Sequence, residues 1–85
     1  MKDIYYEIYT RSSCPFCDMA INLLNEKSVE WVSIEDREEV LREQKERWNW
    51  RTVPIVVEMD PSENRRRLIG GYTELVKYFE KVSNH

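Results

Sequence analysis

Hydrophobic positions in the first part of the chain change their spacing, and each change marks a predicted element. Residues 4–10 are rich in Tyr and Ile and contain no breaker, which predicts a buried strand. From residue 15 the apolar positions recur at helical spacing, so we expect a helix over residues 15–27. A second, short strand is predicted at residues 31–34.

The pattern in the rest of the chain predicts a helix, a hairpin and a final helix. Asp36 followed by Glu39 is typical of a capping box, so we expect a helix over residues 37–48. Residues 52–54 break that helix because they end in a proline. The elements expected after the break are strands at residues 55–57 and 65–69, a turn between them at 60–64, and an amphipathic helix at 72–82.

This order of elements, βαβαββα, predicts an α/β fold. A helix connects the first two strands, which should therefore be parallel, and the last two strands form an antiparallel hairpin. The expected result is a mixed four-stranded sheet with helices on both faces. A chain of 85 residues has room for one hydrophobic core, so we expect a single domain over residues 1–85.

Composition and charge narrow the range of functions. Hydrophobic residues make up 41% of the chain, with three Trp, five Tyr and two Phe, which suits a packed core and not a disordered chain. The net charge of −3 argues against general binding to nucleic acid. The first ten residues lack the apolar run of a secretory signal, and no stretch approaches the length of a membrane span. We therefore expect a cytoplasmic protein that binds neither nucleic acid nor membranes, and a monomer by default.

Cys14 and Cys17 carry the candidate chemistry. Random placement of two cysteines gives this spacing about one time in forty, and cytosolic cysteines rarely form structural disulfides. The pair lies between a predicted strand and a predicted helix, which places Cys14 at the helix N-cap and Pro15 at the first helical position. Unpaired N–H groups and the helix dipole then favour the Cys14 thiolate and lower its pKa from about 8.5 toward or below 7. Arg11 would add positive potential, and Cys17, facing the core, suits a thiol that attacks a mixed disulfide on Cys14.

Three other interpretations of the cysteines are weaker. The first is an ordinary reduced pair at a helix start, which ignores the context of strand and helix. The second is a structural zinc site, which needs four ligands, whereas the only histidine is His85, the last residue. The third is a cysteine protease, whose thiolate depends on a histidine partner that this sequence does not place nearby.

Three segments of the sequence resemble the dithiol glutaredoxins of the thioredoxin-like superfamily, in the family's order. They are TRSSCPFC at residues 10–17, RTVP at 51–54 and IGGYTEL at 69–75, and the resemblance extends from about residue 4 to residue 82. It implies a thioredoxin-like fold and a disulfide oxidoreductase with Cys14 and Cys17 as catalytic residues. Three positions depart from the family pattern: Phe16 stands where Tyr is more usual, Glu74 where Asp is common, and residues 46–50 lack a glycine that relatives often have.

The resemblance also implies glutathione as co-substrate, with no permanently bound cofactor and no metal. In the family the proline matching Pro54 is cis, and the backbone of the preceding residue, Val53, pairs with the cysteinyl part of glutathione. The γ-glutamyl carboxylate is bound by backbone N–H groups at Thr73 and Glu74. Candidates for binding the glycyl carboxylate are Arg11, Lys45, Arg51 and the neutral donor Gln44. The full set expected to bind glutathione is Arg11, Phe16, Gln44, Lys45, Arg51, Thr52, Val53, Pro54, Gly71, Tyr72, Thr73 and Glu74.

The activity implied by the family is the reduction of protein disulfides and of glutathionylated proteins. Glutathione resets the enzyme, and glutathione reductase with NADPH supplies the electrons. Two alternatives stay open. A redoxin on the same fold would take electrons from thioredoxin reductase. An iron–sulfur cluster carrier would hold a cluster between two chains through Cys14 and two glutathiones, an arrangement that Pro15 and the second cysteine disfavour.

Two groups of residues outside these motifs have simpler expected roles. Arg65, Arg66 and Arg67 are interpreted as a solubilising edge of the hairpin. Of Trp48 and Trp50, we expect one to rim the active site and the other to pack against the sheet.

Overall fold

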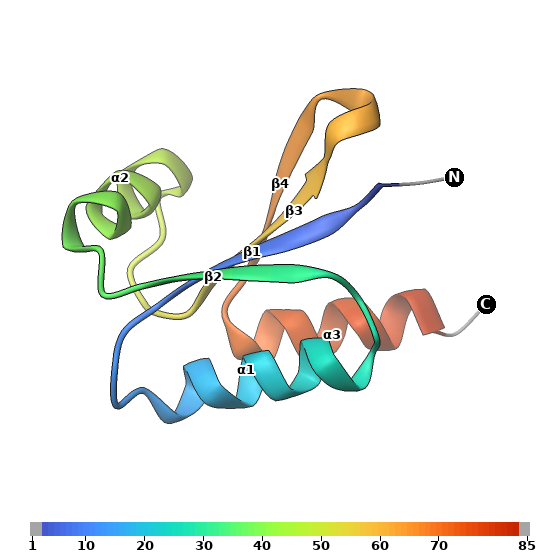
Figure 1. Cartoon of the computed structure of the whole chain (residues 1–85), viewed down its shortest axis with the longest axis horizontal. Coiled ribbons are helices and arrows are strands. Elements are labelled where there is room, and N and C mark those ends of the chain that lie inside the picture. The colour runs from blue at the N-terminus through green and yellow to red at the C-terminus, as the bar shows by residue number, and fades with distance from the viewer. Residues whose placement is uncertain (1–2, 84–85) are drawn as a thin grey trace.

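The structure, a computed structural model, describes residues 3–83 as a mixed four-stranded sheet with three α-helices (Figure 1). The elements in chain order are β1 (Tyr5–Thr10), α1 (Pro15–Glu26), β2 (Trp31–Glu35), α2 (Glu38–Trp48), β3 (Ile55–Asp60), the 3-10 helix η1 (Pro61–Glu63), β4 (Arg65–Gly70) and α3 (Tyr72–Ser83). The predicted order of strands and helices is confirmed. None of the helices in the described part of the chain is long and apolar enough to cross a membrane.

The sheet has the strand order β2-β1-β3-β4. The parallel pairing of β1 with β2 and the antiparallel hairpin of β3 and β4 are as predicted. The structure adds the antiparallel pairing of β1 with β3. β3 is longer than the expected strand over residues 55–57 and continues to Asp60. The reason is tertiary: Glu58 pairs with Tyr6 of β1 on one side and with Arg67 of β4 on the other, so ladder hydrogen bonds extend the strand past its apolar run.

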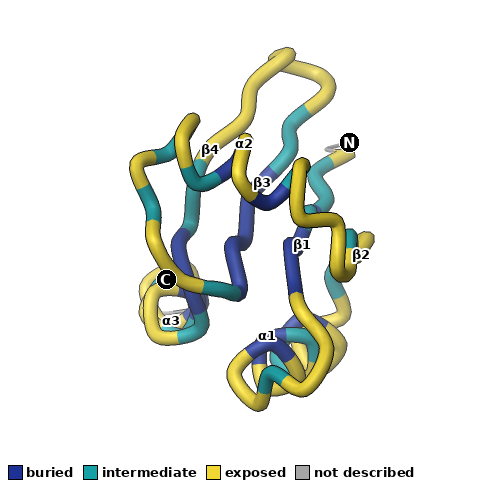
Figure 2. The backbone as a smooth tube through the Cα atoms, turned by 90° about the vertical axis from the view of Figure 1, so that its left-hand side faces the viewer, coloured by how far each residue is buried: buried dark blue, intermediate teal, exposed yellow. Residues whose placement is uncertain are grey.

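Helices cover both faces of the sheet, as predicted, with α1 and α3 on one face and α2 on the other (Figure 1). Successive residues of β1 therefore enter different cores: Ile8 packs with Leu24 and Leu75 toward α1 and α3, whereas Tyr9 packs with Leu41 toward α2. The central strands β1 and β3 are the most deeply buried part of the backbone (Figure 2).

Both ends of α2 differ from the sequence-based expectation. The predicted capping box is wrong, because the N-cap residue is Arg37, which makes no side-chain cap hydrogen bond, and Asp36 has a left-handed backbone with φ 56°. The C-cap is Asn49, which has φ 53°. Asn tolerates this left-handed conformation better than most residues, so Asn49 ends α2 in a segment that contains no glycine.

A buried carboxylate joins three strands to α3. Glu58 accepts hydrogen bonds from the hydroxyl groups of Tyr6, at 3.1 Å, and of Tyr78, and it forms an ion pair with Arg67 at 3.1 Å. Burial raises the pKa of Tyr6 well above its ordinary value, so this hydroxyl stays protonated and donates. Arg67 thus has a structural partner at the hairpin edge, in addition to the solubilising role expected of Arg65–Arg67.

Candidate active site

Cys14 lies at the N-cap of α1, and Pro15 follows at the first helical position, as the spacing predicts. The loop that leads out of β1 brings the two sulfur atoms together, and Cys14 and Cys17 form a disulfide with their Cα atoms 5.2 Å apart. The Cys14 Sγ atom accepts a hydrogen bond from the backbone N–H of Cys17 at 3.2 Å. Cys17 is only 1% exposed, whereas Cys14 is half-buried, so Cys14 is the more accessible of the two cysteines.

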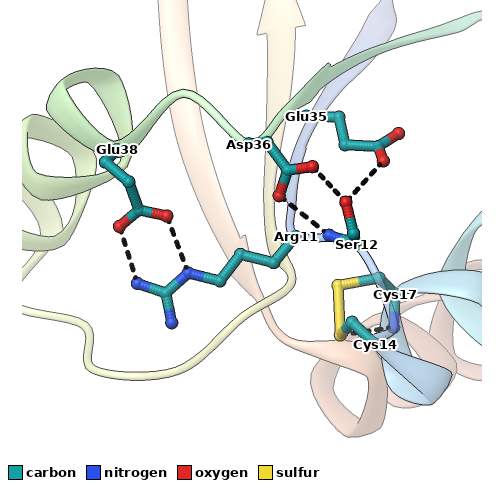
Figure 3. The surroundings of a disulfide bond; sticks show 7 residues. All are labelled: Arg11, Ser12, Cys14, Cys17, Glu35, Asp36 and Glu38. Carbon is teal, nitrogen blue, oxygen red and sulfur yellow. Dashed lines mark hydrogen bonds and ion pairs between the residues drawn. A yellow bond between two sulfur atoms is a disulfide. The ribbon is translucent and has the colours of Figure 1, made fainter.

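The loop before Cys14 is fastened to the turn between β2 and α2 (Figure 3). The backbone N–H of Ser12 donates to Asp36 Oδ1 at 2.9 Å, and its hydroxyl donates to the carboxylates of Asp36 and Glu35. Both hydrogen bonds from Ser12 lower the pKa of Asp36 below its ordinary 3.8, and the one from the hydroxyl has the larger effect. Asp36 therefore holds the loop before Cys14 and does not cap the start of α2, which explains why the predicted capping box is wrong.

Arg11 points away from the cysteines and toward α2 (Figure 3). Its Nε atom donates to Glu38 Oε2 at 3.1 Å and its Nη2 atom donates to Glu38 Oε1 at 3.0 Å. The positive potential that Arg11 was expected to add at the Cys14 sulfur is thus largely compensated by a carboxylate. The start of α1 and the Cys17 N–H remain as the positively polarised groups beside the Cys14 sulfur.

A hollow of 340 Å³ adjoins the cysteine motif through Phe16. We call it the Phe16 hollow; its lining residues are Phe16, Trp50, Thr52, Val53, Pro54, Gly71, Tyr72, Thr73 and Glu74. The structure thereby brings the three motif segments to one place. The peptide bond between Val53 and Pro54 is cis, as the resemblance implied. The rings of Phe16 and Tyr72 lie 6.2 Å apart, centroid to centroid.

The turn at Gly70 and Gly71 presents the start of α3 to this hollow. Gly71 accepts the first intrahelical hydrogen bond, from Leu75 N–H at 3.0 Å, and its own N–H donates to Glu74 Oε1 at 2.9 Å. This contact is half of a capping box, with the side chain of Glu74 reaching back to the N-cap. Since glycine has no side chain, Gly71 supplies no acceptor for the N–H groups of Thr73 and Glu74, which makes this helix start suitable for an anion.

Trp50 was not among the residues expected to bind glutathione. It lines the Phe16 hollow, and its ring lies against the glycine turn: a Cβ atom added at Gly70 would be 3.2 Å from Trp50 Cη2. Its buried Nε1 atom has no hydrogen-bond partner. Trp48 and Trp50 both pack against the core that contains Leu41, but Trp48 does not line the hollow and donates from Nε1 to Gln44 Oε1 at 2.9 Å. One of the two tryptophans therefore rims the hollow, as expected. The only sequence signal for Trp50 was its place directly before the RTVP segment.

The four candidates for the glycyl carboxylate do not lie in the Phe16 hollow. Arg11 and Lys45 line a second hollow of 170 Å³, the Arg11 hollow, together with Glu38, Leu41 and Arg42. Arg42 was not among the residues expected to bind glutathione. Gln44 is buried and accepts a hydrogen bond from Trp48. Arg51 is exposed and lines neither of the two hollows.

No group of three or more His, Cys, Asp or Glu side chains among residues 3–83 is arranged to hold a metal ion. His85, considered above as a zinc ligand, lies outside the described residues.

Comparisons with known proteins show which family has this sequence pattern and this fold. The family model described as Glutaredoxin matches residues 6–62. Fifteen chains of solved structures match as well. One is glutaredoxin 1 from Francisella tularensis, complexed with cacodylate, with 26% identity and a TM-score of 0.67 over 96% of this chain and 99% of that one. Another is the solution structure of glutaredoxin from Brucella melitensis, with 28% identity and a TM-score of 0.66 over 91% and 79%. No curated protein sequence matches.

Proposed function

The chain belongs to the glutaredoxin family, and from this premise we propose that it is a glutathione-dependent thiol-disulfide oxidoreductase. Its substrates would be glutathionylated proteins and proteins with internal disulfides. The observation that carries the proposal is the Cys14–Cys17 pair at the start of α1, beside a hollow that all three glutaredoxin-like segments line. We further propose that the protein acts as a monomer in the cytoplasm and that glutathione reductase, with NADPH, regenerates its glutathione.

The reaction begins at Cys14. Its thiolate attacks one sulfur of the substrate disulfide, an S–S bond forms to Cys14, and the other substrate sulfur leaves as a thiolate. The position at the helix N-cap, with the Cys17 N–H 3.2 Å from Sγ, supports this role because both features stabilise negative charge on the sulfur.

The intermediate on Cys14 has two fates. When Cys14 carries glutathione, a second glutathione thiolate attacks the glutathionyl sulfur, which gives oxidised glutathione and frees Cys14. When Cys14 is bonded to a protein, the Cys17 thiolate attacks the Cys14 sulfur, releases the protein thiolate and leaves the disulfide between Cys14 and Cys17. The burial of Cys17 supports its role as the resolving thiol, since only an adjacent sulfur reaches it.

Glutathione would lie along the Phe16 hollow. The backbone of Val53 would pair with its cysteinyl unit, and the N–H groups of Thr73 and Glu74 would bind its γ-glutamyl carboxylate. The extended shape of the tripeptide would place its glycyl carboxylate near the Arg11 hollow, where Arg11, Arg42 and Lys45 supply positive charge. Phe16 and Tyr72 would form an apolar wall on the side of the cysteines.

The test is NADPH consumption with glutathione, glutathione reductase and a glutathionylated mixed disulfide. We expect activity in the wild type, loss of activity in Cys14→Ser and retained activity in Cys17→Ser, because deglutathionylation needs only the first cysteine. A protein disulfide as substrate should require both. If the wild type were inactive here but turned over with thioredoxin reductase, the glutathione-dependent reaction would be wrong and the chain would be a redoxin on the same fold.

A further inference from the structure

We propose that Glu38 determines how strongly this protein binds glutathione, because it occupies the guanidinium group of Arg11. The inference rests on the proposed function and concerns a residue that none of the motifs contains. It makes Glu38 a specificity-determining residue that competes with the substrate's own carboxylate.

The geometry of the pair is that of a bound carboxylate. Arg11 uses two donors, Nε and Nη2, against the two oxygens of Glu38, at 3.1 and 3.0 Å (Figure 3). This two-point arrangement is the one in which arginine binds a substrate carboxylate. A glycyl carboxylate that approaches Arg11 therefore meets a site whose donors are already in use.

The surroundings favour an exchange of carboxylates over simple addition. The Arg11 hollow contains three cationic side chains, Arg11, Arg42 and Lys45, and one acidic side chain, Glu38. The side chains of Arg11 and Glu38 are 43% and 61% exposed, and ion pairs this exposed contribute little, so an incoming carboxylate can displace Glu38.

A displaced Glu38 also has a favourable place to go. It is the first residue of α2, whose N-cap, Arg37, makes no side-chain cap hydrogen bond. Its carboxylate would stay near the positive end of the helix dipole. Since one carboxylate replaces another on Arg11, Arg11 adds little net affinity for glutathione while Glu38 is present, and removing Glu38 should release that affinity.

The experiment measures binding of S-methylglutathione, which cannot react, by calorimetry at low ionic strength. We expect Glu38→Gln to lower the dissociation constant by up to about fivefold, the equivalent of the upper end for an exposed ion pair. Glu39→Gln is the matched control, because it removes the same charge from the neighbouring exposed residue of the same helix turn. It should leave the constant within a factor of about 1.5. The effect of Glu38→Gln should shrink in ~1 M salt.

A double-mutant cycle decides whether Arg11 mediates the effect. In the Arg11→Gln background, Glu38→Gln should no longer tighten binding. An equal effect of Glu38→Gln and Glu39→Gln, no effect of Glu38→Gln, or an effect that persists without Arg11 would each overturn the inference. These outcomes are distinct from failure of the proposed function, which would appear as a wild type that neither binds S-methylglutathione nor turns over in the glutathione assay.

Discussion

Adding a single methyl group at Gly70, by Gly70→Ala, should disturb the glycine turn that presents α3 to the Phe16 hollow. The Gly70 backbone has φ 126°, a region that side-chain-bearing residues rarely adopt. The new Cβ atom would also lie 2.7 Å from Glu74 Cβ, 2.8 Å from Glu74 Cγ and 3.2 Å from Trp50 Cη2. Either the backbone of the turn or the start of α3 must therefore move.

The expected loss of stability follows from two contributions. A non-glycine residue in a sparsely populated backbone region costs roughly 1–3 kcal/mol. Overpacking against neighbours with little freedom costs about as much again, typically 1–3 kcal/mol. Together they predict a loss of about 2–6 kcal/mol from a domain of this size, whose total stability is on the order of 4–13 kcal/mol. A loss of ~3 kcal/mol corresponds to a fall in Tm of about 12–24 °C.

The assay is urea unfolding followed by tryptophan fluorescence, with the disulfide kept oxidised, and Gly71→Ala is the comparison. Gly71 has no positive φ, and a Cβ atom there would meet the end of the Glu74 side chain, Oε1, at 3.3 Å and otherwise only more distant atoms, so we expect a loss below ~1 kcal/mol. Equal losses in the two variants, or a Gly70→Ala variant within ~0.5 kcal/mol of the wild type, would refute the reasoning. Because Thr73 and Glu74 follow the turn, Gly70→Ala should also raise the KM for glutathione.

Three further predictions concern other parts of the molecule. Glu58→Gln should lower the free energy of unfolding by about 2 kcal/mol, because it removes a buried carboxylate that accepts from Tyr6 and Tyr78 and pairs with Arg67. Urea unfolding measures this loss, and Glu63→Gln, at an exposed position, should change the free energy of unfolding by less than ~0.5 kcal/mol. The lowered pKa of Asp36 means that its contribution to stability is present above its ordinary pKa of 3.8 and lost as the pH falls below that value, so unfolding measured between about pH 5 and 2 should show a smaller acid-induced loss in Asp36→Asn than in the wild type. Phe16→Ser removes an apolar side chain that is 57% exposed and lines the Phe16 hollow, so it should raise the KM for glutathione several-fold while Tm changes little; a large fall in Tm with unchanged KM would contradict this assignment.

Much of the site was predictable because its main parts are local in sequence. Cys14 and Cys17 are three residues apart, and the change from strand to helix just before Pro15 is visible in the hydrophobic pattern, so the N-cap position of Cys14 follows from the sequence. The peptide bond before Pro54 was a different case. Proline by itself leaves the trans form favoured, and only the family resemblance led to the cis geometry that the structure has.

The partners of charged and aromatic side chains were decided by the tertiary structure. Glu38 is 27 residues from Arg11. From the sequence alone, a cationic residue on the same helix would be a nearer partner for Glu38 than Arg11. Only the parallel pairing of β1 with β2 brings the end of β1 beside the start of α2. The same pairing places Asp36 beside Ser12, so Asp36 accepts a hydrogen bond from Ser12 and does not form the expected capping box.

The sequence by itself therefore determined the order of the strands and helices and the position of Cys14 at the start of α1. Each of these depends on residues within a few positions of one another, where backbone geometry sets which side chains share a face. Only the tertiary structure decided that Trp50 lies against Gly70 and that Arg11 is held by Glu38. Side chains this far apart in the chain meet according to how the sheet and its helices pack, which periodicity does not encode.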